Sequence, residues 1–160
     1  MKIVVFSDSH GKLEAMKQVT KKENPDRIFH LGDCERDAAR LHSFFPDIPL
    51  DGVPGNCDFG DSPHTKLLII NGKKIMLTHG HDFNVKASFL RIAYEAQERG
   101  ADAVFFGHTH RAFYENNNGV LLFNPGSVGE PRYGTQASYG VLEIEEDGSF
   151  HVETRIVGTF

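Results

Sequence analysis

Residues 2–10 read KIVVFSDSH, an apolar run that ends abruptly in a polar turn. Such a run is typical of a β-strand that is buried on both faces, as in a parallel sheet covered by helices. Residues 13–22 (LEAMKQVTKK) then place apolar side chains at helical spacing, and Asn24-Pro25 ends that pattern. A buried strand followed directly by a helix predicts an α/β domain.

The same strand-and-helix unit occurs a second time. Residues 27–33 (RIFHLGD) form another apolar run with a polar end, and a helix is predicted from Arg36 to Phe45, before Pro46. Residues 48–56 (IPLDGVPGN) predict a third short strand and a loop. Strands that alternate with helices indicate a mainly parallel sheet with right-handed crossovers.

The middle of the chain changes to a hairpin pattern. Residues 65–80 (TKLLIINGKKIMLTHG) predict two antiparallel strands joined at Asn71-Gly72, which is a strong turn signal. A helix is predicted next, from Lys86 to Arg99, with a glycine after its last residue.

The rest of the chain reads as strands. Residues 101–106 (ADAVFF) predict one strand, and residues 112–124 and 138–157 predict two further antiparallel hairpins. No repeat, low-complexity tract or linker interrupts this order. We therefore expect residues 1–160 to form a single domain with a mixed sheet system.

Composition excludes several classes of partner. The 17 Lys and Arg residues are outnumbered by 22 Asp and Glu residues, giving a net charge of −5, and this argues against strong nucleic-acid binding or a membrane-binding face. No apolar run approaches the roughly 20 residues of a membrane helix, and the N-terminal run lacks the signature of a secretory peptide. Two cysteines are too few for a disulfide framework. We expect a cytoplasmic protein, monomeric or weakly homo-oligomeric.

Polar residues of one chemical kind follow five of the predicted strands. Ligands of open α/β sheets lie beyond the carboxyl ends of the strands, so these side chains are expected to converge. In an extended chain alternate side chains share a face, so Asp8 is expected to point with His10, and His108 with His110. The residues concerned are Asp8, His10, Asp33, Asn56, His79, His108 and His110.

These seven residues have the chemistry of a metal site. Imidazole nitrogen, carboxylate and amide oxygen, without a required thiolate, form a ligand set that suits Mn, Fe, Co, Ni or Zn. Seven candidate ligands exceed what one ion needs. The sequence therefore predicts two divalent ions that share a bridging carboxylate.

The motifs DSH, GD, GN, THGH and GHTH, each after an apolar run and in this order, resemble those of the calcineurin-like metallophosphoesterases, in particular their small single-domain prokaryotic phosphodiesterase branch. The resemblance spans positions 8 to 110. It implies a four-layer αββα fold, in which a double β-sandwich of two mixed sheets is flanked by helices. It also implies a dinuclear centre bridged by Asp33, with one ion held by Asp8, His10 and His110 and the other by Asn56, His79 and His108.

Two positions depart from the family pattern. Many relatives have a histidine that assists protonation of the leaving group where this chain has Cys57, and cysteine is a poor proton donor near neutral pH. We therefore expect faster turnover of substrates with good leaving groups, such as aryl phosphates, than of alkyl phosphates. Arg36 stands where many relatives carry an acid, and neighbouring Asp37 is the candidate to compensate for it. The candidate catalytic residues are Asn56, Cys57, Asp58, His79 and His108, with Asp58 expected mainly to orient its loop.

Two further residues are candidates for substrate contact. Arg132 ends a Gly- and Pro-rich segment, residues 124–132, and is a plausible phosphate contact. His81 either touches substrate or caps the next turn, and the sequence leaves both open. The histidines outside the motifs are expected to lie at the surface or to form hydrogen bonds in the core, and they are His30, His42, His64 and His151. The two cysteines, Cys34 and Cys57, are expected to be small, reduced side chains that fill space.

Three functions are compatible with these features. The first is a divalent-metal-dependent phosphodiesterase, for which the resemblance implies attack by a metal-bridging hydroxide, manganese as the first choice of metal, small phosphoesters as substrates and aryl phosphodiesters as model substrates. The second is a scaffold, as in the phosphoesterase-like subunit of the eukaryotic retromer coat. The third is a nuclease, ranked last because the chain has no basic stripe or added domain. The intact ligand set favours the first.

Overall fold

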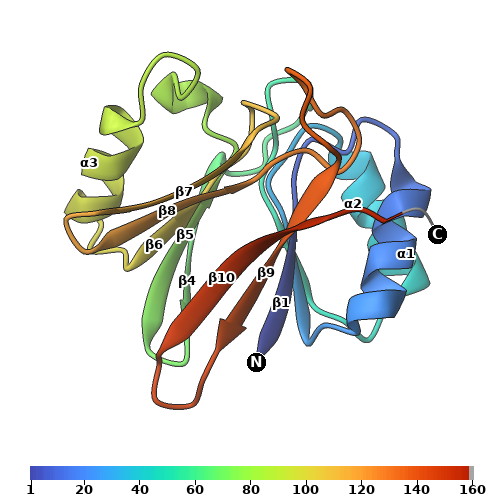
Figure 1. Ribbon diagram of the computed structural model, residues 1–160, viewed down its shortest axis with the longest axis horizontal. Coiled ribbons are helices and arrows are strands. Elements are labelled where there is room, and N and C mark those ends of the chain that lie inside the picture. Colours follow the sequence, from blue (N-terminus) through green and yellow to red (C-terminus); the bar gives the residue numbers. More distant parts are fainter. Residues whose placement is uncertain (159–160) are drawn as a thin grey trace.

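The computed structural model describes residues 1–158, in which two five-stranded mixed sheets pack face to face (Figure 1). The first sheet has the order β10-β9-β1-β2-β3. Within it β1 pairs in parallel with β2 and β2 with β3, whereas β9 and β10 are antiparallel. Its strands are β1 (Lys2–Phe6), β2 (Arg27–His30), β3 (Leu50–Gly52), β9 (Ser138–Ile144) and β10 (Phe150–Ile156).

The second sheet has the order β4-β5-β6-β8-β7. Strands β5, β6 and β8 run parallel, and β4 and β7 close the two edges in antiparallel fashion. The predicted hairpin at Asn71-Gly72 is present between β4 and β5. The strands of this sheet are β4 (Thr65–Ile70), β5 (Lys73–Thr78), β6 (Ala103–Phe105), β7 (Ala112–Asn117) and β8 (Val120–Pro125).

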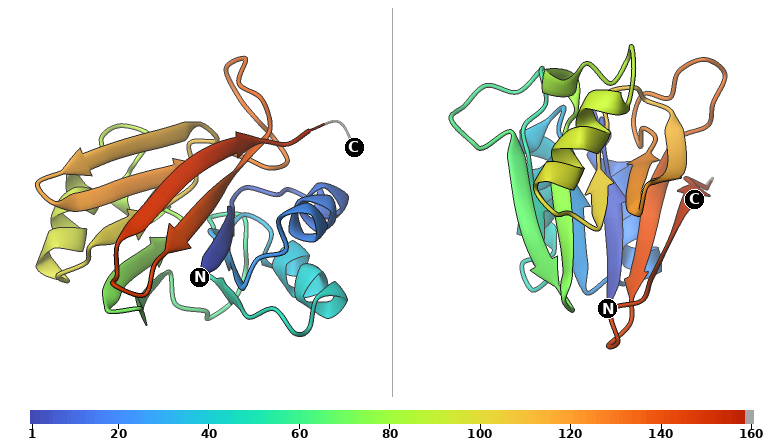
Figure 2. Two further views of the ribbon diagram at one scale, coloured as in Figure 1. Left: turned by 60° about the horizontal axis from the view of Figure 1, so that its bottom comes forward. Right: turned by 90° about the vertical axis from the view of Figure 1, so that its left-hand side faces the viewer.

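Helices cover the outer face of each sheet (Figures 1 and 2). Helices α1 (Leu13–Glu23) and α2 (Glu35–Phe44) pack on the first sheet, and α3 (Leu90–Glu98) packs on the second. The predicted αββα sandwich is therefore confirmed. No helix among residues 1–158 is long and apolar enough to cross a membrane.

Strand β1 explains why the opening run is continuously apolar. Ile3 and Val5 point into the core between the two sheets, where they pack with Phe29 and other inner-face residues. Val4 and Phe6 point the other way, into the core beneath α1 and α2. Both faces of this strand are buried, so alternation of apolar and polar residues is absent.

The predicted helix over residues 86–99 is wrong at its start. Residues 81–83 form a short 3₁₀ helix and Lys86 lies in a turn, so the α-helix begins only at Leu90. Asn84 adopts a left-handed conformation, with φ of 54°, which ends the 3₁₀ helix before Lys86. The Ser88 hydroxyl accepts a hydrogen bond from the Leu90 amide, 3.2 Å away, at the first turn.

Candidate metal centre

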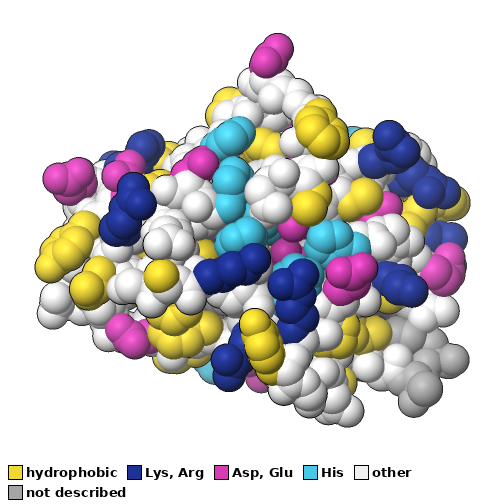
Figure 3. All heavy atoms as spheres, turned by 90° about the horizontal axis from the view of Figure 1, so that it is seen from above, with side chains coloured by type: hydrophobic (Ala, Val, Ile, Leu, Met, Phe, Trp, Pro, Cys, Tyr) yellow, Lys and Arg dark blue, Asp and Glu magenta, His cyan; other side chains and the backbone are white. Residues whose placement is uncertain are grey.

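The loops that follow β1, β2, β5 and β6 meet at one end of the two sheets. There the predicted ligands gather in two groups, within each of which the ligand atoms all lie within 4.8 Å of one another. Figure 3 shows this end of the molecule, with a band of histidines interrupted by acidic side chains and bordered by Lys and Arg. One group is Asp8, His10, Asp33 and His110, and the other is Asp33, His79 and His108.

The first group is nearly closed to solvent. The Nε2 atom of His110 lies 3.1 Å from Oδ1 of Asp8, and Nε2 of His10 lies 3.6 Å from Oδ2 of Asp33. The rings of His10 and His110 stack with their centroids 5.1 Å apart. All four side chains thus present polar atoms to one small volume.

The predicted amide ligand, Asn56, lies beside the second group. The Nε2 atom of His79 lies 3.4 Å from Oδ2 of Asp33, 3.2 Å from Oδ1 of Asn56 and 3.2 Å from Nδ1 of His108. Asp33 is therefore the one residue that belongs to both groups, which is the position of a bridging carboxylate.

The backbone at these residues is not extended, and our prediction of alternate side chains on a strand is wrong. Strands β1 and β6 end at Phe6 and Phe105. Asp8, His10, His108 and His110 all have positive φ, between 43° and 68°. This left-handed conformation is unfavourable for residues other than glycine, so the convergence depends on tight turns that the fold must hold. These turns deliver the side chains to the same place that extended strands were expected to reach.

Backbone carbonyls orient two of the imidazoles. The Nδ1 atom of His79 lies 2.7 Å from the Leu31 carbonyl, and Nδ1 of His110 lies 2.6 Å from the Glu130 carbonyl. A ring that donates from Nδ1 keeps the lone pair of Nε2 free to bind a metal ion. Sequence reasoning missed these acceptors, since every residue has a carbonyl and no side-chain signal distinguishes them.

Two carboxylates hold the ligand loops. Asp37 accepts hydrogen bonds from the Ser9 hydroxyl at 2.8 Å and the Gly11 amide at 2.7 Å, so it supports the loop after β1. The neighbouring Arg36 is exposed.

Asp58 acts on the loops after β2 and β3. It accepts hydrogen bonds from the backbone amides of Cys34, Glu35 and Gly55, at 2.8 to 3.2 Å. These contacts make it a residue that orients its loop, as expected, and a separate catalytic role for it stays a prediction.

Gly55 brings the backbone against the bridging carboxylate. A Cβ atom at this position would overlap Oδ1 of Asp33, and it would also meet the Asp33 amide. The close approach lets the Cys57 amide donate to Asp33 Oδ1 at 3.0 Å. A side chain at residue 55 would therefore displace the carboxylate shared by both groups.

The electrostatics favour binding of cations. Burial alone would raise the pKa of Asp8, but its hydrogen bond with His110 and the nearby imidazoles hold that pKa below its ordinary value. The pKa of Asp33 is also lowered, because the hydrogen bond and charge of His79 outweigh its burial. Burial, reinforced by the charges of His79 and Lys86, lowers the pKa of His108 to about 4. At neutral pH the carboxylates are thus anionic and His108 is an uncharged donor.

The donor set fits divalent metal ions. His10 Nε2 is buried and has no hydrogen-bond partner among residues 1–158, and Oδ1 of Asp8 has only the His110 ring beside it, 3.1 Å away. Such atoms are costly to bury unless something binds them. With imidazole, carboxylate and amide donors and no thiolate in either group, the site suits the ions predicted from the sequence.

Cys57 lies at the rim of this site. It is an exposed, free cysteine, and its Sγ accepts a hydrogen bond from Nδ2 of Asn56 at 3.4 Å. Desolvation and the negative charge of Asp33 raise the pKa of the thiol above its ordinary value. Cys57 therefore stays protonated at neutral pH and is a weak acid.

The other histidines vary in their surroundings. His30 is buried beneath the site and its Nε2 lies 3.1 Å from the Ser9 hydroxyl, as expected for a hydrogen-bonded core histidine. The His81 ring lies 5.5 Å from the His79 ring between centroids, and its Nδ1 is buried without a partner among residues 1–158. His64 is exposed and pairs with Asp82 at 2.7 Å.

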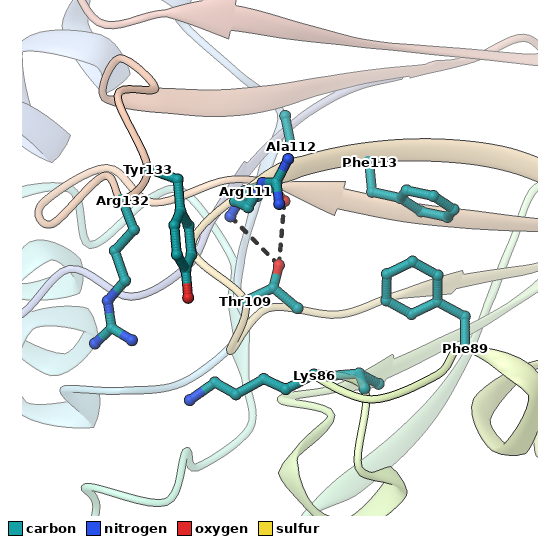
Figure 4. A pocket seen from close by; sticks show the side chains of 9 residues that line it. Lys86, Phe89, Thr109, Arg111, Ala112, Phe113, Arg132 and Tyr133 are labelled. Carbon is teal, nitrogen blue, oxygen red and sulfur yellow. Dashed lines mark hydrogen bonds between the residues drawn. The ribbon is translucent and has the colours of Figure 1, made fainter.

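An open cavity lies next to the GHTH turn, and Arg132 is part of its wall (Figure 4). Its other charged lining residues, Lys86 and Arg111, were missed by sequence reasoning. No motif contains the two of them, and three separate loops bring these cations together.

Comparisons with known proteins show which family the chain belongs to. Residues 1–147 match the calcineurin-like phosphoesterase superfamily domain. The probable metallophosphoesterase YsnB of Bacillus subtilis is 39% identical over 153 residues, which cover 93% of this chain and 88% of YsnB. The phosphodiesterase YfcE of Escherichia coli K12 is 28% identical over 173 residues, with coverage of 89% and 88%.

A solved structure gives the same result. The crystal structure of a conserved protein of Streptococcus pneumoniae TIGR4, described as a predicted phosphoesterase, superposes with a TM-score of 0.82 at 32% identity and covers 97% of this chain and 88% of that chain. The chain therefore belongs to the calcineurin-like phosphoesterase superfamily and is a metallophosphoesterase, a hydrolase that acts on phosphoesters.

Proposed function

We propose that this protein hydrolyses phosphodiesters with the help of two divalent metal ions, of which manganese is our first choice and Ni, Fe, Co and Zn are alternatives. One observation carries the proposal: two groups of metal-binding side chains share a single carboxylate, Asp33. Two ions held this way suit an in-line displacement at phosphorus, because one site can serve the attacking oxygen and the other the departing oxygen.

The charges of the site favour an anionic substrate. Two divalent ions would bring four positive charges, against two negative charges from Asp8 and Asp33, so the loaded site is positive on a chain whose net charge is −5. When bound, the ions supply a water of lowered pKa and an electrostatic clamp for the phosphoryl group. No serine or cysteine nucleophile is then required.

The protein's own residues would position the substrate. Our candidates to contact the phosphoryl oxygens are His81, whose ring centroid lies 6.1 Å from that of His108, and Arg132, which lines the cavity beside the GHTH turn. Asn56, His79 and His108, together with Asp33, would hold the second metal ion. Cys57 stands at the position of the leaving-group acid, and its raised pKa makes protonation of a departing alkoxide slow. Aryl phosphodiesters, whose leaving groups need little protonation, are therefore the proposed model substrates.

The test is a panel of phosphomonoesters and phosphodiesters assayed with Mn²⁺, Ni²⁺, Co²⁺ and Zn²⁺, with His110→Ala as the blank. We expect metal-dependent release of 4-nitrophenolate from bis(4-nitrophenyl) phosphate, with diesters preferred over monoesters. A protein that binds no metal and turns over no substrate would favour the scaffold function instead.

A further inference from the structure

A cavity of about 340 Å³ lies beside the candidate metal centre, and Arg132 is the one residue of its lining that has a role in the proposed reaction. Thr109, which lies between the candidate ligands His108 and His110, is one of its lining residues. The Thr109 hydroxyl is fixed there by contacts with the Arg111 backbone (Figure 4). A group that enters the cavity therefore lies beside the turn that carries His108 and His110.

One wall of the cavity is cationic. Lys86, Arg111 and Arg132 all line it, and none of them forms an ion pair with a carboxylate among residues 1–158. Lys86 and Arg132 act electrostatically on His108 and His110, respectively, so their charges reach the metal centre. Three unpaired cations in one cavity of an acidic chain indicate an anionic ligand.

Three aromatic side chains, those of Phe89, Phe113 and Tyr133, also line the cavity. Phe89 and Phe113 lie with ring centroids 4.3 Å apart, and the Arg111 guanidinium lies 5.4 Å from the centroid of the Tyr133 ring. Figure 4 shows the amine of Lys86 and the guanidinium of Arg132 toward one end of the cavity and the two phenylalanine rings toward the other. Tyr133 is 80% exposed, so most of its surface is accessible to a ligand.

We propose that this cavity binds one ester arm of the substrate, and that this arm is a nucleotide that carries a second phosphate. The assignment rests on the proposed function, which places the reacting phosphate at the metal centre. The base would stack on the aromatic side chains, and the second phosphate would bind Lys86 and Arg111. Arginine and lysine bind phosphate through charge-assisted hydrogen bonds, and aromatic rings stack with bases.

A matched pair of substrates tests the proposal. Thymidine 5′-(4-nitrophenyl phosphate) and the same compound with a 3′-phosphate release the same leaving group and differ only in the second phosphate. We expect kcat/KM to be about tenfold higher for the 3′-phosphorylated compound, the gain from one good charge-assisted contact. Methyl 4-nitrophenyl phosphate, which has no nucleotide arm, should be the poorest of the three by roughly a further tenfold.

Substitutions in the cavity test which residues cause the preference for the 3′-phosphorylated substrate. Lys86→Met and Arg111→Met should each reduce the ratio of kcat/KM between the two thymidine substrates toward one. Arg91→Met is the matched control, because Arg91 is an exposed cation close to Phe89 in sequence that does not line the cavity, and it should keep the wild-type ratio. Calorimetry with thymidine 3′,5′-bisphosphate and thymidine 5′-phosphate gives a second readout that does not depend on turnover.

The outcomes separate the two proposals. A wild-type ratio near one, with all three diesters hydrolysed, would overturn the nucleotide arm and leave the phosphodiesterase function standing. Absence of hydrolysis of any diester would contradict the proposed function. In that case, tighter binding of thymidine 3′,5′-bisphosphate than of thymidine 5′-phosphate, lost in Lys86→Met, would still support binding of a second phosphate in the cavity. Equal binding of the two thymidine phosphates would overturn that assignment.

Discussion

At the scale of the residue, Asp33 is the side chain on which the centre depends. Its two oxygens lie within reach of His79, His10 and the Cys57 amide, at 3.4, 3.6 and 3.0 Å. Its lowered pKa keeps it anionic, so it offers negative charge to both ligand groups at once. Loss of that single charge should weaken both groups, whereas loss of any other ligand should weaken one.

Asp33→Asn preserves the shape of the side chain and removes its charge. We expect it to lower metal affinity and kcat by more than about 100-fold, beyond the 10- to 100-fold typical of residues that only support a ligand. Metal content after dialysis, measured by atomic emission, checks this result. Asp47→Asn, at an exposed position outside both groups, is the control and should retain its metal. Full metal content in Asp33→Asn would contradict the bridging role.

Cys57→His tests the acid step. A histidine at this position can protonate a departing alkoxide near neutral pH, so the variant should depend less on leaving-group pKa than the native protein. The measurement is the slope of log kcat against leaving-group pKa for a series of diesters. Equal slopes in the two proteins would show that residue 57 does not protonate the leaving group.

The convergence of the seven candidate ligands could be predicted from sequence because each one follows an apolar run within a short motif. Their left-handed conformations could not, since positive φ at Asp8 or His108 arises from the turn that the surrounding loops impose. Lys86 and Arg111 could not be predicted as neighbours either, because only the folded loops bring them into one cavity.

At the scale of the element, Glu23 joins the end of α1 to the first sheet. Its carboxylate accepts hydrogen bonds from Tyr139 of β9 and Arg155 of β10, each at 2.7 Å, and pairs with Lys2 of β1 at 2.6 Å. Burial opposes ionisation of Glu23, but these three partners outweigh it and lower its pKa to about 2. One buried carboxylate thus holds a helix and three strands together.

Glu23→Gln should therefore destabilise the protein in a pH-dependent way. The folded-state pKa is lower than the ordinary value of 4.5, so the stabilisation is complete above about pH 4.5 and is lost as the pH falls toward 2. We expect a loss of about 2 kcal/mol at pH 7, reduced from the full linkage value because Lys2 and Arg155 are partly exposed. Urea unfolding of both proteins from pH 7 to pH 3 checks it. A difference that stays constant with pH would contradict the assignment.

Helices α1 and α2 and the hairpin at Asn71 agree with their predicted bounds to within one residue or so, because local signals define their ends. The start of α3 does not. Residues 86–88 have helical propensity, but the chain needs turns there to leave the metal centre and reach the outer face of the second sheet. Tertiary packing overrides propensity in such a segment.

At the scale of the whole molecule, the two sheets depend on close packing between their inner faces. Gly140 of β9 faces Phe123 of β8, and a Cβ atom at residue 140 would lie 2.6 Å from Cε1 of that ring and 3.2 Å from Cβ of Val5. The glycine thus makes room for a buried phenylalanine of the opposite sheet. A local pattern does not reveal this pairing, nor that the C-terminal hairpin adds β9 to the edge of β1.

Gly140→Ala should loosen the sandwich without touching a metal ligand. Overpacking of this kind costs about 1–3 kcal/mol, which a urea unfolding midpoint detects. Gly158→Ala, where an added Cβ meets nothing within 4 Å, is the matched control and should change stability by less than about 0.5 kcal/mol. Equal stability of the two variants would contradict the tight packing of Phe123.

The central claim is that side chains from five separate loops hold two divalent ions on one shared carboxylate. Anomalous diffraction from a crystal grown with Mn²⁺ tests it most directly. We expect two manganese peaks about 3.5–4 Å apart on either side of Asp33, one beside His110 and the other beside His79. A single peak away from Asp33, or no peak among these ligands, would contradict it.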